Sequence, residues 1–329
     1  MNTKDIPQHL INTKEIDDRP NTPYCMSFPF DLTSLVRSIK EVGLINIPLL
    51  IRNENKTLDV VLGFRRIKAL KSLGWEKIPC KILPETEMSP VECLLLNLND
   101  NLATRTFNDV EKAMVISRLS TCLEKNEVLE HYMPLLGLSS QESTRAFYCR
   151  LDDELDEEIK TSIISGQLSL HAARLILEMD DEAKTSVFKL MSSLKFNVNQ
   201  QKQLIDYIGD INHIDNRFIS DILKDKSIQN ICSDPQMNNP QKVNALLREL
   251  RSRIFPKLID AEQTFKRMVS ALDLPERVKI TAPPFFESSH YRMEILFKTG
   301  EELKEKIDRL ERTEGLAELY NPWEKDFNA

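Results

Sequence analysis

Apolar residues in the first hundred positions follow two different periods, one typical of helices and one typical of strands. Within residues 32–42 the apolar positions lie three or four apart, which predicts an amphipathic helix. Asp31 is placed to cap its N-terminus and Gly43 to end it. The residues that share its apolar face are Leu32, Leu35, Val36, Ile39 and Val42.

Short apolar runs typical of buried strands recur three times, at residues 47–51, 58–62 and 78–83. A polar turn over residues 53–56 joins the first two strands. A helix over about residues 64–73, ended by Gly74, joins the second strand to the third. This alternation of strands and helices predicts a small α/β domain over residues 1–105.

Beyond these strands the pattern becomes almost entirely helical. The Ser-Pro pair at 89–90 predicts the start of a helix that runs to about Asn101. Asn108, followed three residues later by Glu111, predicts a capped start for the next helix. We therefore predict an all-α domain over residues 106–211.

The last third of the chain divides into a polar segment and a mixed domain. Residues 212–239 are polar and short in aromatic residues, and we predict that they form a mixed linker and helical hairpin. Residues 240–329 predict a small α+β domain, in which helices broken at Pro256 precede two strands and a charged helix. The strands are expected at residues 278–281 and 291–298, and the last helix at 301–312.

Composition and charge narrow the class of protein. The formal net charge of −7 disfavours a protein that coats DNA without sequence preference, because neutralising phosphates needs a basic face. The six cysteines include no CxxC pair, which predicts reduced thiols rather than a zinc or redox site. We expect a cytoplasmic protein that does not enter the membrane, since the sequence has no signal peptide and no apolar run of about 20 residues.

The residues with the clearest chemistry are Gly63-Phe64-Arg65-Arg66, at the predicted junction of a strand and a helix. The free backbone N–H groups at the start of a helix attract anions, and arginine side chains add charged donors suited to phosphate. The alternative is an ordinary strand-to-helix turn whose arginines are solvated. The residues alone do not separate these two interpretations.

Four motifs in the correct order resemble the ParB-like family of DNA-associated proteins. The similarity covers about residues 8–210. Residues 35–48 resemble the family's helix-glycine-Gln-Pro stretch, and residues 63–70 resemble its Gly-Glu-Arg-Arg-x-Arg-Ala box. Residues 73–80 resemble the Leu-Gly and Ile-Pro-Val that follow this box. The Glu-Asn-x-x-Arg box is resembled by Asp100, Asn101, Arg105 and Glu111. The resemblance implies a ParB/sulfiredoxin-like α/β fold, followed by a helix-turn-helix domain.

The resemblance also implies a ligand, because this domain binds CTP with magnesium in the family. By position, the contacts to the triphosphate would be Gly63, Arg65, Arg66 and Asn101. Gly43 and Pro48 would lie near the nucleobase, and Asp100 would be the metal ligand. Phe64 stands where the family has a glutamate linked to metal handling and hydrolysis. We therefore expect at most a slow CTP hydrolase, whose catalytic residues are unknown. Phe64 also takes the position of the sulfiredoxin nucleophile, which excludes thiol chemistry there.

Residues 127–151 predict two helices joined by a turn at 136–139, a pattern typical of a helix-turn-helix. The second helix would offer its polar side chains to DNA, and these are Gln141, Ser143, Thr144 and Arg145. The alternative is a turn in a helical bundle without a ligand. The acidic run at 152–158 lies close by, and it weakens a DNA-binding interpretation.

Together these features predict a CTP-regulated, DNA-binding protein of chromosome or plasmid partition or of transcription regulation. The expected partners are a specific DNA site, a second copy of the chain and a ParA-type ATPase, and the protein is expected to associate with the nucleoid. One alternative is an enzyme on the same fold, a nuclease or small-molecule kinase, which would need a carboxylate or histidine beside the phosphate loop as base or metal ligand. Its candidates are Asp100, Asp59 and Glu111. The other alternative is an adaptor that has lost nucleotide binding.

Overall fold

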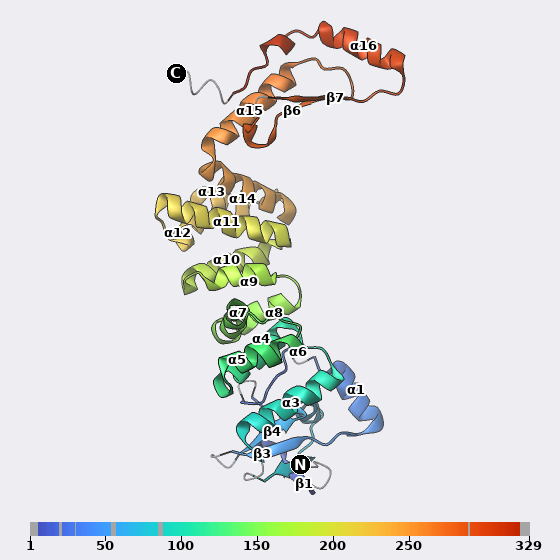
Figure 1. Ribbon diagram of the computed structural model, residues 1–329, viewed down its shortest axis with the longest axis vertical. Helices are drawn as coiled ribbons and strands as arrows, with labels where there is room; N and C mark the ends of the chain where they lie inside the picture. The colour runs from blue at the N-terminus through green and yellow to red at the C-terminus, as the bar shows by residue number, and fades with distance from the viewer. Residues whose placement is uncertain are drawn as a thin grey trace. The chain divides into compact units, whose positions relative to one another are not determined.

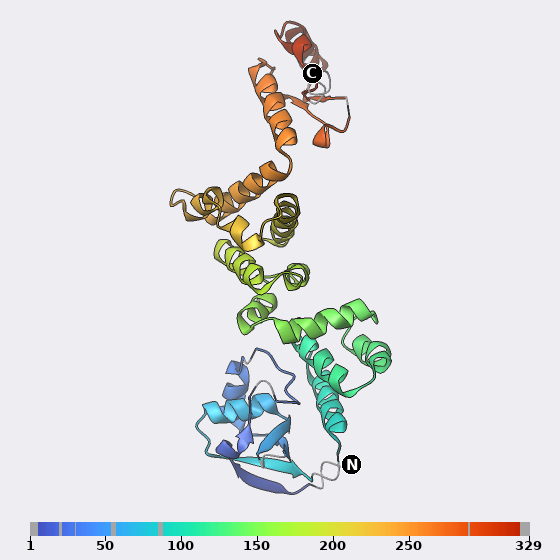
Figure 2. The same cartoon turned by 90° about the vertical axis from the view of Figure 1, so that its left-hand side faces the viewer.

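The computed structural model describes residues 6–19, 22–29, 31–53, 57–84, 88–288 and 290–322. Residues 54–56 of the predicted polar turn lie outside this range. The chain folds into two compact units, Met1–Ile205 and Asp206–Ala329. Figures 1 and 2 both show the large sheet at the N-terminal end of the first unit, with helices packed beside it.

The sheet of the first unit has five strands in the order β1-β5-β3-β4-β2. The strands are β1 (Gln8–Asn12), β2 (Ile16–Asp17), β3 (Leu49–Arg52), β4 (Leu58–Leu62) and β5 (Lys77–Leu83), with a short 3-10 helix η2 (Thr13–Glu15) after β1. β1 runs antiparallel to β5, and β3 antiparallel to β4, whereas β3 with β5 and β2 with β4 are parallel. The three strands that the apolar runs predict are confirmed, and the outer strands β1 and β2 are additional.

Three helices accompany the sheet: α1 (Thr33–Val42), α2 (Phe64–Ser72) and α3 (Pro90–Thr104). α2 covers the sheet with its apolar face, since Ile67, Ala69 and Leu70 are fully buried in one core cluster with strand residues such as Leu50 and Ile78. The predicted serine cap of α3 is confirmed, because the Ser89 side chain accepts from the Glu92 backbone N–H. The α/β prediction for this part of the chain is thereby confirmed.

The following residues are helical, as predicted from residue 108 onward. The helices are α4 (Asp109–Cys122), α5 (Lys125–Glu127), the π-helix η3 (Val128–Tyr132), α6 (Met133–Leu135), α7 (Glu142–Glu154), α8 (Glu157–Ile164), α9 (Leu170–Leu177), α10 (Asp181–Leu194) and α11 (Val198–Asp215). Gly137 has a left-handed φ of +70°, and the N–H of Leu138 donates to the Met133 carbonyl, so the helical run 125–135 ends in a tight turn. α7 then packs against α4, where the Tyr148 hydroxyl donates to Asp109 at 3.1 Å.

The second unit begins within α11 and contains α12 (Ile219–Leu223), α13 (Lys226–Ser233), α14 (Asn239–Ile254), α15 (Pro256–Ala271), β6 (Val278–Thr281), η4 (Pro284–Phe286), β7 (Arg292–Ile295), α16 (Gly300–Glu311) and η5 (Leu316–Glu318). For residues 212–239, predicted as a mixed linker and helical hairpin, the structure has the helices α12 and α13, and they are part of the folded second unit and not a linker. The apolar side chains of Ile222 and Ile228 are buried there. Arg217 and Arg253 both pair with Asp225, at 2.8 and 2.6 Å, so the polar composition of this segment serves ion pairs inside the fold.

The last helices and strands share a small aromatic core. β6 and β7 form a two-stranded antiparallel sheet. Phe265 of α15 stacks on Tyr291, with ring centroids 5.0 Å apart, and meets Phe286 edge to face at 6.0 Å. The chain therefore ends in a mixed helix and strand region, with α15 beginning at Pro256.

Candidate functional site

The first unit contains a pocket of about 410 Å³ beside the N-terminus of α2. Four stretches of the chain line it: the segment at 26–27, α1, the start of α2 and the second half of α3. The lining residues are Met26, Ser27, Ser34, Leu35, Ser38, Gly63, Phe64, Arg65, Arg66, Asn97, Asp100, Asn101, Thr104 and Arg105. Polar and cationic groups dominate this list, which suits a charged ligand.

The turn from β4 into α2 depends on Gly63. Its φ is +91°, a left-handed conformation that glycine adopts without strain. A Cβ at this position would lie 3.3 Å from the backbone of Pro48 and 3.2 Å from Nη1 of Arg66. Glycine is needed here both for the turn and for this close approach, which leaves the N-terminus of α2 open toward the pocket.

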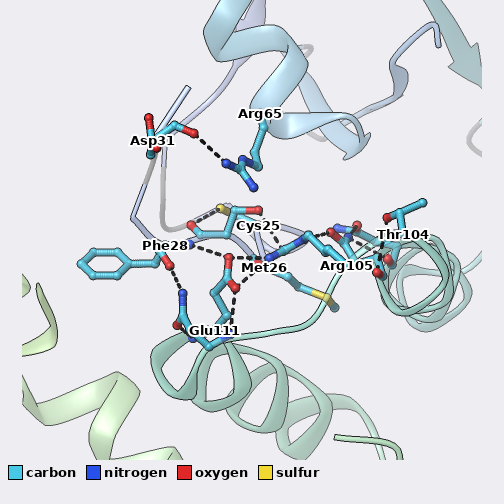
Figure 3. A network of polar contacts seen from close by, with 12 residues as sticks. Cys25, Met26, Phe28, Asp31, Arg65, Thr104, Arg105 and Glu111 are labelled. Atoms are coloured by element: carbon cyan, nitrogen blue, oxygen red, sulfur yellow. Dashed lines mark hydrogen bonds and ion pairs between the residues drawn. The ribbon is translucent and has the colours of Figure 1, made fainter. Parts of the chain in front are cut away.

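The two arginines of the turn have unused donors. Arg65 donates from Nη2 to the backbone carbonyl of Asp31 at 2.6 Å, but its Nε is buried with no hydrogen-bond partner among the described residues (Figure 3). For Arg66, no hydrogen bond or ion pair to another described residue is found. A buried unpaired donor is costly, so a bound anion would stabilise this arrangement.

Asp100 and Asn101 face these arginines from α3. Asp100 is half-buried in the pocket lining. The Asn101 amide donates to the Asn97 side chain at 2.5 Å, and its Oδ1 accepts from Nε of Arg105 at 2.7 Å. The pocket thus has a cationic wall from α2 and a wall of carboxylate and amide groups from α3.

Arg105, at the end of α3, is the centre of a buried polar network (Figure 3). Its Nη1 donates to both carboxylate oxygens of Glu111 at 2.7 Å, and its Nη2 donates to the Met26 carbonyl at 2.7 Å. Glu111 is only 4% exposed, and its carboxylate also accepts the backbone N–H groups of Phe28 and Asn108. This network joins the pocket segment at 26–28 to the end of α3 and the start of α4.

The residues predicted to contact a nucleotide lie mostly together. Gly63, Arg65, Arg66, Asp100 and Asn101 all line the pocket. Pro48 touches the Gly63 turn from behind, and Gly43 lies at the end of α1, outside the lining. The sequence interpretation missed Ser34 and Ser38, which lie one helical turn apart on the polar side of α1. Both serines could have been predicted from the sequence, because they lie in the polar stripe opposite the apolar face of this helix.

Most of the carboxylates considered as a catalytic base or metal ligand do not line the pocket. Phe64 is 6% exposed and belongs to the apolar core. Asp59 does not line the pocket: it pairs with Asn53 at 2.9 Å, and burial raises its pKa. Glu111 is held by Arg105 and by two backbone N–H groups. Asp100 is the remaining carboxylate among the three candidates, and the described residues include no cluster of three or more metal-ligating side chains.

The four residues predicted to contact DNA lie at the start of α7 but in different surroundings. Gln141 and Ser143 are exposed. Thr144 shares a hydrogen bond with Ser139 at 2.9 Å. Arg145 faces α4 instead of solvent: it is ion-paired with Glu142 and donates to Ser120 at 3.0 Å, and its side chain is 19% exposed. The Arg145 guanidinium is therefore held by protein partners, whereas Gln141 is exposed.

Comparisons with known proteins identify the family. The ParB N-terminal domain model matches residues 2–97. A probable chromosome-partitioning protein ParB of Chlamydia muridarum is 32% identical over 191 residues, covering 56% of this chain and 65% of that protein. Stage 0 sporulation protein J of Bacillus subtilis is 30% identical over 214 residues, covering 64% of this chain and 72% of that protein. The chain belongs to the ParB-like family.

The extent of these similarities is limited. For the first four curated relatives, the matched region spans 58% to 65% of the relative's length. Among solved structures, the C-terminally truncated chromosome-partitioning protein ParB from Caulobacter crescentus, complexed with CTP-gamma-S, is 24% identical with a TM-score of 0.26, covering 53% of this chain and 94% of that chain. Separately, none of the helices within the described ranges has the length and apolar character needed to cross a bilayer.

Proposed function

We propose that this chain is a DNA-binding protein of partition type whose N-terminal pocket binds CTP. The observation that carries the proposal is that Arg65 and Arg66 line one pocket with Gly63, Asp100 and Asn101, while Nε of Arg65 has no hydrogen-bond partner among the described residues. Membership of the ParB-like family supports CTP as the nucleotide, and several relatives are named as chromosome-partitioning proteins. Calorimetric titration of the full chain with CTP and Mg²⁺ tests it.

In this proposal the triphosphate lies at the N-terminus of α2. Arg65 and Arg66 neutralise its charge, and the backbone N–H groups after Gly63 donate to its oxygens. Magnesium is usually held by one or two carboxylates together with substrate phosphates, so the lone Asp100 fits this role. The base would extend toward α1, where Ser34 and Ser38 offer hydroxyl groups.

Hydrolysis of CTP should be slow, below about one turnover per second. Phe64 offers neither a metal ligand nor a base, and among the enzyme candidates only Asp100 lines the pocket. Phosphate release would be followed with CTP, Mg²⁺ and DNA, and Asp100→Asn should remove any residual turnover. Faster release, or release that Asp100→Asn leaves unchanged, would show that another group supplies the chemistry.

For DNA, we propose that the helical run 125–135, the turn at Gly137 and α7 act as a helix-turn-helix with α7 as the reading helix. The supporting observations are the tight turn and the exposed N-terminal end of α7, where Gln141 and Ser143 are free to reach a groove. Helix N-termini also bind phosphates of the DNA backbone. A nucleoid-associated location would follow from such binding.

Replacing Gln141 with alanine should weaken a selected DNA site by roughly 1–3 kcal/mol and leave the melting temperature unchanged. Fragments bound by the native chain would first be selected from random DNA, and the variants titrated against them. Gln203→Ala, an exposed glutamine on α11, is the matched control. Arg145→Ala should lower stability as well as binding, because Arg145 ties α7 to Glu142 and Ser120. Unchanged affinity in Gln141→Ala would remove the start of α7 as the reading surface.

The second unit would provide a homodimer contact. Its exposed apolar side chains include Met293, Leu296, Phe297 and Ile307, on or near β7 and α16. These side chains and the edges of the two-stranded sheet are open to solvent, so pairing with the same surface of a second copy would cover them. For a ParA-type ATPase partner, the support is family membership alone.

Leu296→Glu should therefore convert a dimer into a monomer in sedimentation experiments. A buried carboxylate at an apolar contact costs several kcal/mol, enough to shift the association constant strongly. Ile214→Glu changes an equally apolar exposed residue on α11 and should leave the dimer intact. A native chain that sediments as a monomer, or a Leu296→Glu dimer, would contradict this contact.

A further inference from the structure

Two large apolar side chains are exposed where α11 ends and α12 begins in the second unit. Ile214, in the last turn of α11, is 62% exposed, and Phe218, at the N-cap of α12, is 71% exposed. α12 follows α11 directly, so the two side chains flank one short turn at residues 215–217 (Figure 1). Aromatic residues are enriched at the centres of protein interfaces, so an open phenylalanine near an open isoleucine marks this turn as a docking surface.

The backbone that carries Phe218 is fixed by hydrogen bonds. Asn216 has a left-handed φ of +49°, which turns the chain after the last residue of α11. The Asn212 side-chain amide donates to the Arg217 carbonyl at 2.7 Å. The Arg217 guanidinium donates to the Asp225 carboxylate at 2.8 and 3.2 Å. Phe218 is therefore presented by a pre-ordered turn, which lowers the entropic cost of binding a partner.

Negative charge runs along α11 toward these apolar side chains. Asp206 and Asp210 precede Ile214 at four-residue spacing, so the three side chains share one exposed stripe of the helix. The stripe is about 12 Å long, because each helical residue rises about 1.5 Å. Within the described ranges of the chain, the carboxylates of Asp206 and Asp210 form no ion pair or hydrogen bond with another side chain.

The surrounding sequence does not supply cations that would offset this charge. Residues 206–221 contain four aspartates, one arginine and no lysine. The arginine, Arg217, is paired with Asp225, outside this stretch. By contrast, Glu262 of α15 has a cationic partner in Arg251 at 2.8 Å. The surface thus combines an apolar centre with an acidic flank, which repels DNA phosphates and attracts a basic protein segment.

We propose that Ile214 and Phe218 dock an amphipathic helix of a partner protein, in which lysine or arginine residues flank the apolar ones. The apolar side chains of the partner cover Ile214 and Phe218, and its cations lie along Asp206 and Asp210. A helix suits this surface because its side chains recur every three or four residues, the spacing of the stripe on α11. The surface includes none of the residues proposed to contact CTP, DNA or a second copy.

Fluorescence anisotropy of a labelled peptide titrated with the full chain tests this surface. The probe is a synthetic helix of leucine, alanine and lysine, about 18 residues or five turns long, with leucines on one face and lysines beside them. The native chain should bind it saturably. Replacing every lysine of the peptide with glutamate should weaken binding about tenfold or more, because the carboxylates of α11 then repel it.

Phe218→Ser and Ile214→Ser should each weaken binding of the lysine peptide about tenfold or more, the scale of an interface hot spot. Both side chains are exposed, so the melting temperature should not change. Asp206→Asn combined with Asp210→Asn should lower the affinity and reduce its dependence on salt. Val198→Ser is the matched control, because Val198 is 55% exposed at the start of the same helix, and it should leave the affinity unchanged.

The proposal is overturned if the native chain does not bind the lysine peptide, or if the glutamate peptide binds equally well. Equal weakening by Val198→Ser and Phe218→Ser would also refute it, since binding would then reflect general apolar contact. Sedimentation of the Phe218→Ser chain should match that of the native chain. A loss of self-association in this variant would show that a second copy, and not a partner helix, covers the surface.

Discussion

Replacing Arg66 with alanine should lower the affinity for CTP about tenfold or more. Losing a charge-assisted contact to phosphate costs roughly 1.5–3 kcal/mol. Arg66 is half-buried at the Gly63 turn, and no other described residue uses its donors, so its contact with a ligand would not replace an existing bond. Calorimetric titration of the native chain and of the variant measures the change.

Lys68→Ala is the control for this effect on the same helix. Lys68 lies less than one turn beyond Arg66, but its ammonium pairs with Asp18 at 3.1 Å and does not line the pocket. Its removal should leave CTP affinity nearly unchanged although the chain loses the same charge. An equal loss in both variants would indicate general electrostatic attraction, and an Arg66→Ala variant that binds as well as the native chain would place the site elsewhere.

Replacing Glu111 with alanine should destabilise the first unit by about 3–5 kcal/mol, because it leaves the partly buried Arg105, whose side chain is 19% exposed, without its counter-charge. The change also removes the acceptor of the Phe28 and Asn108 backbone N–H groups. Denaturant unfolding of the full chain, followed by a probe in the first unit, measures the loss.

Glu92 provides a matched comparison, because it occupies the same third position of a helix capping box as Glu111. It is exposed, and within the described part of the chain its carboxylate bonds only to Ser89. Glu92→Ala should cost up to about 1 kcal/mol, the usual size of a capping contribution. If the two variants lose the same stability, the network around Arg105 adds nothing beyond a helix cap.

Local patterns predicted much of the first unit. Asn108 with Glu111 marks the start of α4 and Gly63 marks the turn before α2, because capping and left-handed backbone are set by neighbouring residues. β2 was missed because it has only two residues and is defined by pairing with β4. Pairing between distant segments leaves little signal in a short stretch of sequence.

The partners of charged side chains were the least predictable feature of the site. Arg65, Lys68 and Arg105 are all basic residues of the family motifs, yet their surroundings differ. Arg65 has a buried Nε without a partner among the described residues, Lys68 pairs with Asp18, and Arg105 bonds to Asn101, Glu111 and Met26. Arg145 likewise turns toward Glu142 and Ser120. These differences depend on residues brought together by the fold, so spacing along the chain does not reveal them. The same holds for residues 212–239, whose polar side chains form internal ion pairs.

Calorimetric titration of the full chain with each of the four nucleoside triphosphates, in Mg²⁺ and with and without selected DNA, tests the central claim most directly. The account predicts saturable binding of CTP, weaker binding of ATP, GTP and UTP, and a CTP affinity about tenfold or more lower in Arg66→Ala. Binding of none of the four would contradict it and favour an adaptor that has kept the fold alone. Equal binding of all four would retain the phosphate site at Arg65 and Arg66 but refute CTP as the specific ligand.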